Sequence, residues 1–272
     1  MKMKELNINY EQELLKLNTS NKRKVFEKLS LAALSAIPWV GGVISAMASI
    51  PIENKDEISN DLRTEWLKEH EFKLLALKNS LEEIINRISN FGEEIVERIE
   101  SPEYLQLVNL SYRVWDESAT EEKRKFITNL LINSSGTKLC SDDVIRLFID
   151  WIKNYHELHF KIISLIYKIP HISRGEIWRN LSENLEPPRE DSAEADLFKM
   201  IIRDLSMGGV IRQYKPTDYN GNFLKTKKQP VTKTSLAKSA FDNTEPYEIT
   251  NLGRQFVHYT MNENVSRIEE KK

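Results

Sequence analysis

Apolar residues recur at steps of three and four along most of this chain, which is the spacing of amphipathic helices. The longest such pattern covers residues 56–90 and predicts one long helix with an acidic outer face. Similar patterns, many of them bounded by Ser, Thr, Pro or Gly, predict helices at 9–18, 21–37, 43–50, 102–116, 121–133, 142–154, 156–169, 174–184, 193–206 and 251–261. Capping signals mark the starts of four of these helices: Ser101 before Pro102, a capping arrangement at Ser118–Glu121, and capping boxes at Ser173–Glu176 and Asp191–Glu194. Short β-type patterns predict strands at 210–214 and 247–249.

The order of these elements predicts a mainly α protein with two domains. Residues 1–154 are expected to form an N-terminal helical bundle that contains an apolar helical hairpin, 29–52, and the long helix. In residues 155–262, three helices, a strand, a long loop, a second strand and a closing helix follow one another. Because this is the order of a winged helix, we expect a winged-helix-like domain there, followed by a polar tail at 263–272.

The apolar hairpin is a stretch of 24 residues, Leu29 to Ile52, without a charged residue. This length is sufficient to span a bilayer. Pro38 and the pair Gly41-Gly42 would, however, break a single helix and leave carbonyl groups unpaired in lipid. A buried core hairpin is therefore the leading interpretation, followed by reversible membrane contact, and then by a true span or a signal peptide. The residues expected to contact a membrane or a partner are Leu34, Ile37, Trp39, Val40, Val43 and Ile44.

Composition restricts where the protein works and what it binds. Cys140 is the single cysteine, so an intramolecular disulfide is excluded and a thiolate zinc site would lack its ligands. A cytoplasmic protein is therefore expected, at most peripheral to the inner membrane. The net charge of -2 argues against a dedicated nucleic-acid coat. Residues 156–272 nevertheless carry 18 Lys and Arg against 16 Asp and Glu, which leaves a local basic patch open.

The spacing of reactive residues indicates no enzyme. Gly41-Gly42 and Gly208-Gly209 lack the spacing of phosphate-binding loops, and the chain has no Gly-x-Ser-x-Gly elbow. His156 and His159 lie three residues apart on one predicted helix, but zinc needs two further ligands. Surface histidines are the favoured interpretation. We therefore expect no catalytic residue, no metal and no cofactor.

The winged-helix-like domain offers two candidate DNA contacts. Its third predicted helix, 193–206, is rich in apolar residues and carries Asp196 and Asp204, which would repel phosphate. Only Lys199 and Arg203 of this helix could therefore contribute to DNA binding. The predicted wing, 210–240, is strongly basic and could neutralise phosphates. Its candidate nucleic-acid contacts are Arg212, Lys215, Lys225, Lys227, Lys228 and Lys233. A flexible, solvated hairpin is the alternative, and protein contact is the favoured use of the domain.

Three segments of the chain carry motifs that resemble those of known proteins. They are Leu34-Ser-Ala-Ile-Pro-Trp-Val-Gly-Gly-Val-Ile-Ser, Glu121-Glu-Lys-Arg-Lys-Phe-Ile-Thr-Asn-Leu-Leu-Ile-Asn-Ser and Tyr247-Glu-Ile-Thr-Asn-Leu-Gly-Arg-Gln-Phe-Val. In that order, they are similar to an apolar motif near the start, to a helix and to the closing winged-helix signature of bacterial abortive-infection alpha proteins and related defence proteins. The resemblance implies a prokaryotic, non-catalytic protein of phage defence or of a toxin-like conflict system. The long basic wing departs from the short turn expected of the family.

These observations lead to three hypotheses of different classes. The preferred one is a non-enzymatic abortive-infection effector or accessory protein that acts by membrane or protein contact through its apolar hairpin, with another protein or a second copy as partner. The second is a winged-helix DNA-binding regulator that uses the basic wing. The third is an oligomerisation protein built on the long helix.

Overall fold

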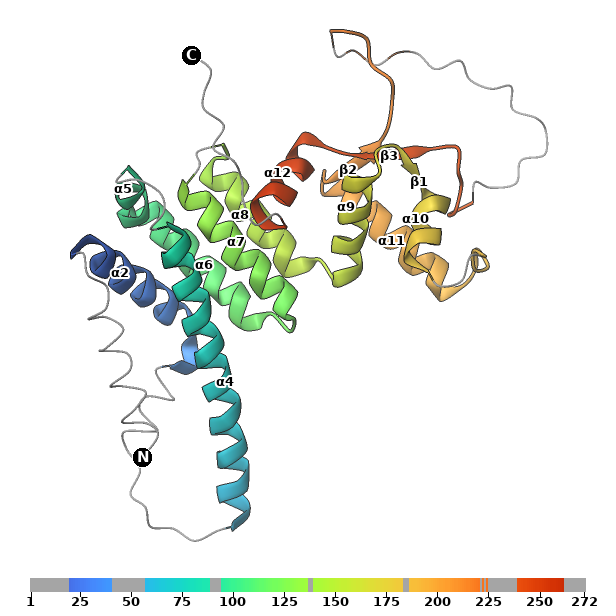
Figure 1. Ribbon diagram of the computed structural model, residues 1–272. Coiled ribbons are helices and arrows are strands. Elements are labelled where there is room, and N and C mark those ends of the chain that lie inside the picture. Colours follow the sequence, from blue (N-terminus) through green and yellow to red (C-terminus); the bar gives the residue numbers. More distant parts are fainter. Residues whose placement is uncertain are drawn as a thin grey trace, which may run out of the picture. The chain divides into compact units, whose positions relative to one another are not determined.

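The computed structural model describes residues 20–40, 57–88, 94–136, 139–182, 186–220, 222, 224 and 239–261. The chain divides into two compact units (Figure 1). Unit 1 comprises Met1–Lys153 and Tyr259–Lys272, and unit 2 comprises Asn154–His258. Helices dominate both units, which confirms the predicted mainly α fold. The predictions for 9–18, 43–50 and the polar tail lie outside the described residues.

Unit 1 is a bundle of helices that pack on a shared apolar core. Its described helices are α2 (Ser20–Ala36), α4 (Glu57–Ile88), α5 (Glu94–Glu100), α6 (Pro102–Glu117), α7 (Glu121–Gly136) and α8 (Asp142–Asn154), of which the last residue belongs to unit 2. Helix α2 packs against α6, and α4 and α6 both pack against α7. Helix α7 is therefore central, and all its residues from Phe126 to Ser135 are buried. The long helix predicted at 56–90 is α4.

Serine and threonine side chains decide where α6 and α7 begin. The Ser101 hydroxyl accepts a hydrogen bond from the backbone N–H of Tyr104 (3.2 Å), and Pro102 follows at the first helical position, as predicted. The predicted cap of α7 at Ser118 is wrong. Ser118 ends α6, because its hydroxyl donates to the Val114 carbonyl (2.6 Å) and is not available to α7. Thr120 caps α7 instead, accepting from the N–H of Lys123 (3.4 Å).

A chain of hydroxyl groups links three helices inside unit 1. Ser80 of α4 lies 3.1 Å from the Tyr112 hydroxyl of α6 and 2.8 Å from the Thr128 hydroxyl of α7. Thr128 in turn donates to the Arg124 carbonyl (3.1 Å). Ser80, Tyr112 and Thr128 are all buried, so each hydroxyl finds in its neighbour the partner that water would otherwise provide.

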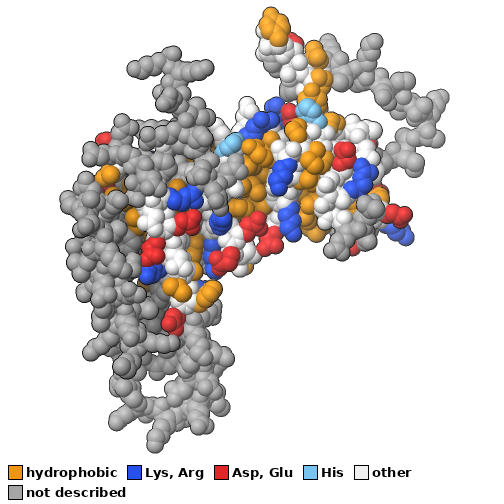
Figure 2. Space-filling model, viewed as in Figure 1, with side chains coloured by type: hydrophobic (Ala, Val, Ile, Leu, Met, Phe, Trp, Pro, Cys, Tyr) orange, Lys and Arg blue, Asp and Glu red, His pale blue; other side chains and the backbone are white. Residues whose placement is uncertain are grey.

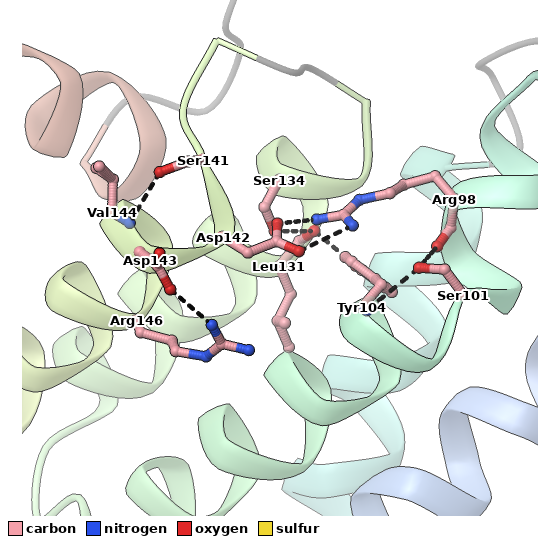
Figure 3. A network of polar contacts seen from close by, with 10 residues as sticks. All are labelled: Arg98, Ser101, Tyr104, Leu131, Ser134, Ser141, Asp142, Asp143, Val144 and Arg146. Carbon is pink, nitrogen blue, oxygen red and sulfur yellow. Dashed lines mark hydrogen bonds and ion pairs between the residues drawn. The ribbon is translucent and has the colours of Figure 1, made fainter.

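A second polar network joins α5, α6, α7 and α8 (Figure 3). The Arg98 guanidinium forms a two-pronged contact with the Asp142 carboxylate, one prong of which measures 3.1 Å. The Tyr104 hydroxyl donates to the Leu131 carbonyl (2.7 Å). Complete burial raises the pKa of Tyr104, so its hydroxyl keeps the proton that it donates.

Two asparagine side chains in the segment Glu121–Ser134 donate hydrogen bonds to the end of another helix. Asn129 and Asn133, one turn apart on α7, are buried and donate to the carbonyls of Thr260 and Tyr259, each at 2.9 Å. Both acceptors lie at the C-terminal end of helix α12 (Asn251–Thr260) and belong to unit 1. The last carbonyls of a helix have no partner within it, so these two asparagines supply the missing donors.

Unit 2 combines helices with a small antiparallel sheet. Its elements are α9 (Glu157–Lys168), β1 (Ile172–Ser173), α10 (Arg174–Leu181), α11 (Ala193–Met207), β2 (Ile211–Gln213), β3 (Pro246–Ile249) and most of α12. The strand order is β1-β3-β2, with Ile172 opposite Tyr247 and Arg212 opposite Glu248. The sequence did not predict β1, because a strand of two residues is too short to show an alternating pattern.

The sequence predicted the N-terminal cap of α10 correctly but not that of α11. The capping box predicted at Ser173 is present: its hydroxyl accepts from the N–H of Glu176, whose carboxylate accepts from the N–H of Ser173. The box predicted to start at Asp191 is wrong. Ser192 caps α11, accepting from the N–H of Ala195 (3.2 Å), because Asp191 is instead engaged by Arg189. Helix α10 also ends earlier than predicted, at Leu181.

The segment Tyr247–Val257 joins β3 to α12 through a tightly packed turn. Thr250 accepts from the N–H of Gly253 (2.9 Å) and donates to the Gly209 carbonyl (2.7 Å), while its own N–H donates to the Val210 carbonyl (3.0 Å). A Cβ atom on Gly253 would lie 2.3 Å from that same carbonyl oxygen. The glycine is therefore needed because the start of α12 lies directly against the residue that precedes β2.

Candidate functional site

A basic groove is the most distinctive surface feature of unit 2. It has a volume of about 670 Å³ and is lined by residues of α11, of the sheet and of the start of α10. Five of the ten described residues that line it are Lys or Arg, and none of the ten is acidic. These five, which we call the groove cations, are Arg174, Lys199, Arg203, Arg212 and Lys215.

The groove cations come together because α10, α11, β2 and the residues that follow β2 all border the same space. Arg174 is the first residue of α10, and Arg212 and Lys215 lie on β2 and just after it. Lys199 and Arg203 are four residues apart on α11 and thus share one helix face. Ile202, Ile211 and Tyr247 are buried and also line the groove.

Two of the cations are fixed by partners on β3. Arg174 donates from Nε to the Tyr247 hydroxyl (2.9 Å), and Tyr247 itself is only 2% exposed. Arg212 donates from Nε to Glu248 Oε1 (2.7 Å). These guanidinium groups are therefore held in one orientation before any ligand arrives, which lowers the entropy lost on binding.

Glu190 connects Lys199 to Ser239 and Ala240, which lie before β3 in the sequence. The Lys199 ammonium donates to the Glu190 carbonyl (2.8 Å) and lies 3.4 Å from its carboxylate. That carboxylate also accepts from the Ser239 hydroxyl and from the N–H of Ala240 (2.9 Å). The hydrogen bond from Ser239 is the main reason why the pKa of Glu190 lies below the usual value of a glutamate. The Glu190 carboxylate thus stays charged where it accepts hydrogen bonds from Ser239 and Ala240.

Arg203 differs from its neighbours in the groove. Within the part of the chain that the structure describes, no side-chain hydrogen bond or ion pair engages its guanidinium, and the side chain is exposed. An anion that enters the groove could therefore be bound by Arg203 without displacing an internal partner.

The structure describes two of the six predicted nucleic-acid contacts. Arg212 and Lys215 line the groove, whereas Lys225, Lys227, Lys228 and Lys233 lie outside the described residues. Lys199 and Arg203 were recognised in the sequence but discounted because apolar residues dominate their helix. Most of these, Phe198, Ile201, Ile202 and Leu205, point into the core of unit 2, so they say nothing about the outer face of α11.

Arg174 is the groove cation that sequence reasoning missed. It was noted only as a residue of the capping box that begins at Ser173. No local pattern could have placed it beside α11, because its position depends on the pairing of β1 with β3, whose partners Ser173 and Pro246 are far apart in the sequence.

One face of the described part of the apolar hairpin, 29–40, lies in the core of unit 1. Ile37 and Val40 are buried, and Leu34 is half-buried. Trp39 is half-buried and donates from Nε1 to Asp116 Oδ1 (2.8 Å). Val43 and Ile44 lie outside the described residues. In the described ranges, no helix is both long enough and apolar enough to cross a bilayer.

The interpretation of the histidine pair as surface residues is wrong for one of the two. His159 is only 2% exposed, and its ring stacks on that of Tyr155 with centroids 4.9 Å apart. Its Nδ1 accepts from the N–H of His156 (3.1 Å), so it serves the start of α9. Across the described residues, no group of three or more His, Cys, Asp or Glu could hold a metal ion.

Comparisons of the chain with models of protein families, with curated proteins and with solved structures gave no significant match.

Proposed function

We propose that unit 2 is a winged helix that binds nucleic acid through its basic groove. The succession α9-β1-α10-α11-β2-β3-α12, with an antiparallel β1-β3-β2 sheet, supports the assignment of the fold. In this architecture α11 is the third helix and the segment between β2 and β3 is the wing. The groove cations lie where these two parts meet, and this is the observation that carries the proposal.

Phosphate is the ligand group that best suits the groove. Arginine donors form paired hydrogen bonds to phosphate oxygens, and the five cations on α10, α11, β2 and the residues after β2 can contact several phosphates of one strand. The carboxylates that pair with groove cations, Glu190, Asp196 and Glu248, do not line the groove themselves. The groove thus presents positive charge to its ligand, although unit 2 as a whole is nearly neutral.

Fluorescence anisotropy with a labelled 20-base-pair duplex tests this proposal. We expect Arg203→Glu to weaken binding and to reduce the slope of log K against log salt by about 1, the share of one phosphate contact. Lys161→Glu is the matched control, because it makes the same charge change on an exposed residue of α9 that does not line the groove. Equal losses for the two variants would contradict the proposal, and so would the absence of binding by the unmodified protein to both this duplex and a single strand of the same length.

A second candidate function concerns unit 1 and follows from exposed apolar side chains on the hairpin itself and on the long helix that packs against it. Leu31 of α2 is 71% exposed, and Phe72 and Leu75 of α4 are also exposed, although the two helices pack together. We propose that this part of unit 1 contacts a membrane or a partner protein, and that the buried hairpin residues join the contact when the protein is activated. Abortive infection, as the sequence resemblance implies, is the process in which such an effector would act.

Two measurements test the second candidate. Vesicles loaded with a self-quenching dye are expected to leak with the unmodified protein and to stay intact with Trp39→Asp, which places a charge on the hairpin. No leakage with either protein would exclude membrane action. A bacterial host that expresses the chain is expected to show reduced phage plating, and unchanged plating would remove the link to defence.

A further inference from the structure

A structured turn projects from unit 2 directly after β2 (Figure 1). Two backbone bonds pair its arms: the N–H of Leu224 donates to the Pro216 carbonyl (2.8 Å), and the N–H of Asp218 donates to the Asn222 carbonyl (2.9 Å). The Asp218 carboxylate also accepts from the backbone N–H groups of Asn220 and Asn222, each at 2.9 Å. The turn is therefore held by its own hydrogen bonds.

This turn presents an aromatic side chain to solvent. Tyr219 follows Asp218 and is 97% exposed, more than any other large apolar side chain described. Hydrophobic surface is visible at the outer end of the projecting segment (Figure 2). Its immediate neighbours in the sequence, Asp218 and Asn220, are polar.

The turn is close enough to the groove for one ligand to reach both. Lys215 lines the groove, and Tyr219 is four residues further along the chain. Four residues span at most about 14 Å, which corresponds to about four base steps of 3.4 Å. A strand whose phosphates lie in the groove therefore passes within reach of the Tyr219 ring.

We propose that Tyr219 stacks on an unpaired base, and that the preferred ligand of the groove is single-stranded nucleic acid. Proteins that bind single strands combine a positively charged groove with aromatic rings on which bases stack, and here an exposed ring lies four residues along the chain from the groove. In a duplex the bases stack on one another, so a blunt duplex offers phosphates to the groove but no free base face to the ring. The inference rests on the proposed function of the groove.

Anisotropy titrations with two fluorescent probes, a 20-nucleotide oligothymidine and a blunt 20-base-pair duplex, test the inference. We expect Tyr219→Ala to weaken binding of the single strand at least fivefold, and that of the duplex less than twofold. Tyr219→Phe keeps the ring and is expected to stay within twofold of the unmodified protein on both probes. Met207→Ala is the control for loss of an exposed apolar side chain, because Met207 is 79% exposed and does not line the groove.

The results separate this inference from the function on which it rests. If Arg203→Glu weakens binding of both probes but Tyr219→Ala does not weaken binding of the single strand, the groove proposal stands and the role of Tyr219 is refuted. The inference is also refuted if Tyr219→Ala weakens both probes equally, since the ring then does not distinguish unpaired bases. If the unmodified protein binds neither probe, both proposals fail.

Discussion

Substitution of Gly253 by alanine tests the packing that places β2 beside α12. An alanine Cβ would lie 2.3 Å from the Val210 carbonyl oxygen and 2.8 Å from Ile249 Cγ1. To restore the 3.0 Å that real contacts respect, the carbonyl oxygen would have to move by about 0.7 Å. This oxygen accepts the N–H of Thr250 at 3.0 Å, so the movement would also stretch that hydrogen bond.

The opposing energies give Gly253→Ala a definite sign. Overpacking costs about 1–3 kcal/mol, and a weakened hydrogen bond costs up to about 1 kcal/mol more. Alanine gains about 0.8–1.0 kcal/mol over glycine from helix propensity. The sum is a net loss of up to about 3 kcal/mol, and of about 1.5 kcal/mol at the middle of these ranges. In a unit of about one hundred residues, this corresponds to a decrease in Tm of roughly 5 °C or more.

Differential scanning calorimetry of the full chain measures the change in Tm, and hydrogen exchange of peptides from β2 and α12 locates it in unit 2. Arg254→Ala is the matched control, because it introduces alanine at the next, exposed position of the same helix. If Gly253→Ala is as stable as this control, or more stable than the unmodified protein, the close approach of α12 to Val210 is not present in solution.

Two further predictions concern buried and charged groups. Tyr104→Phe removes the hydroxyl that donates to the Leu131 carbonyl, so we expect unit 1 to lose about 1–2 kcal/mol in urea unfolding, and an unchanged midpoint would contradict the buried hydrogen bond. The pKa of Glu190 is lowered mainly by the Ser239 hydroxyl, so its contribution to stability is complete above the ordinary glutamate pKa and is lost as pH falls through the lowered value. The amide resonance of Ala240 should report this transition below about pH 4.3, and it should be absent in Glu190→Gln.

Local signals in the sequence predicted the helices of this protein well. Ser101 with Pro102, and Ser173 with Glu176, begin helices where their capping chemistry requires. The errors arose where two residues compete for one role. Ser118 was expected to cap the helix that follows it, but its hydroxyl returns to the helix that precedes it. The order of residues in the sequence does not determine which of two neighbouring residues caps the helix.

The candidate site was less predictable, because long-range packing assembles it. The helical pattern of α11 mixes core positions such as Phe198 with groove positions such as Lys199, and only the packed unit separates the two faces. Arg174 reaches the groove through the pairing of β1 with β3, for which a two-residue strand leaves no periodic signal. His159 was misjudged for a related reason, since its burial depends on the stacking partner Tyr155.

The hydroxyl chain of unit 1 has a mechanical consequence. Packed helices can slide past each other by one turn, about 5.4 Å, when the contacts of the new position are as good as those of the old. For α4 such a step would separate Ser80 from both Tyr112 and Thr128 and bring hydrocarbon opposite their oxygens. Each stranded hydroxyl costs about 1–3 kcal/mol. The part of α4 around Ser80 is therefore held in one register against α6 and α7. A force along the axis of α4 would move these two helices with it.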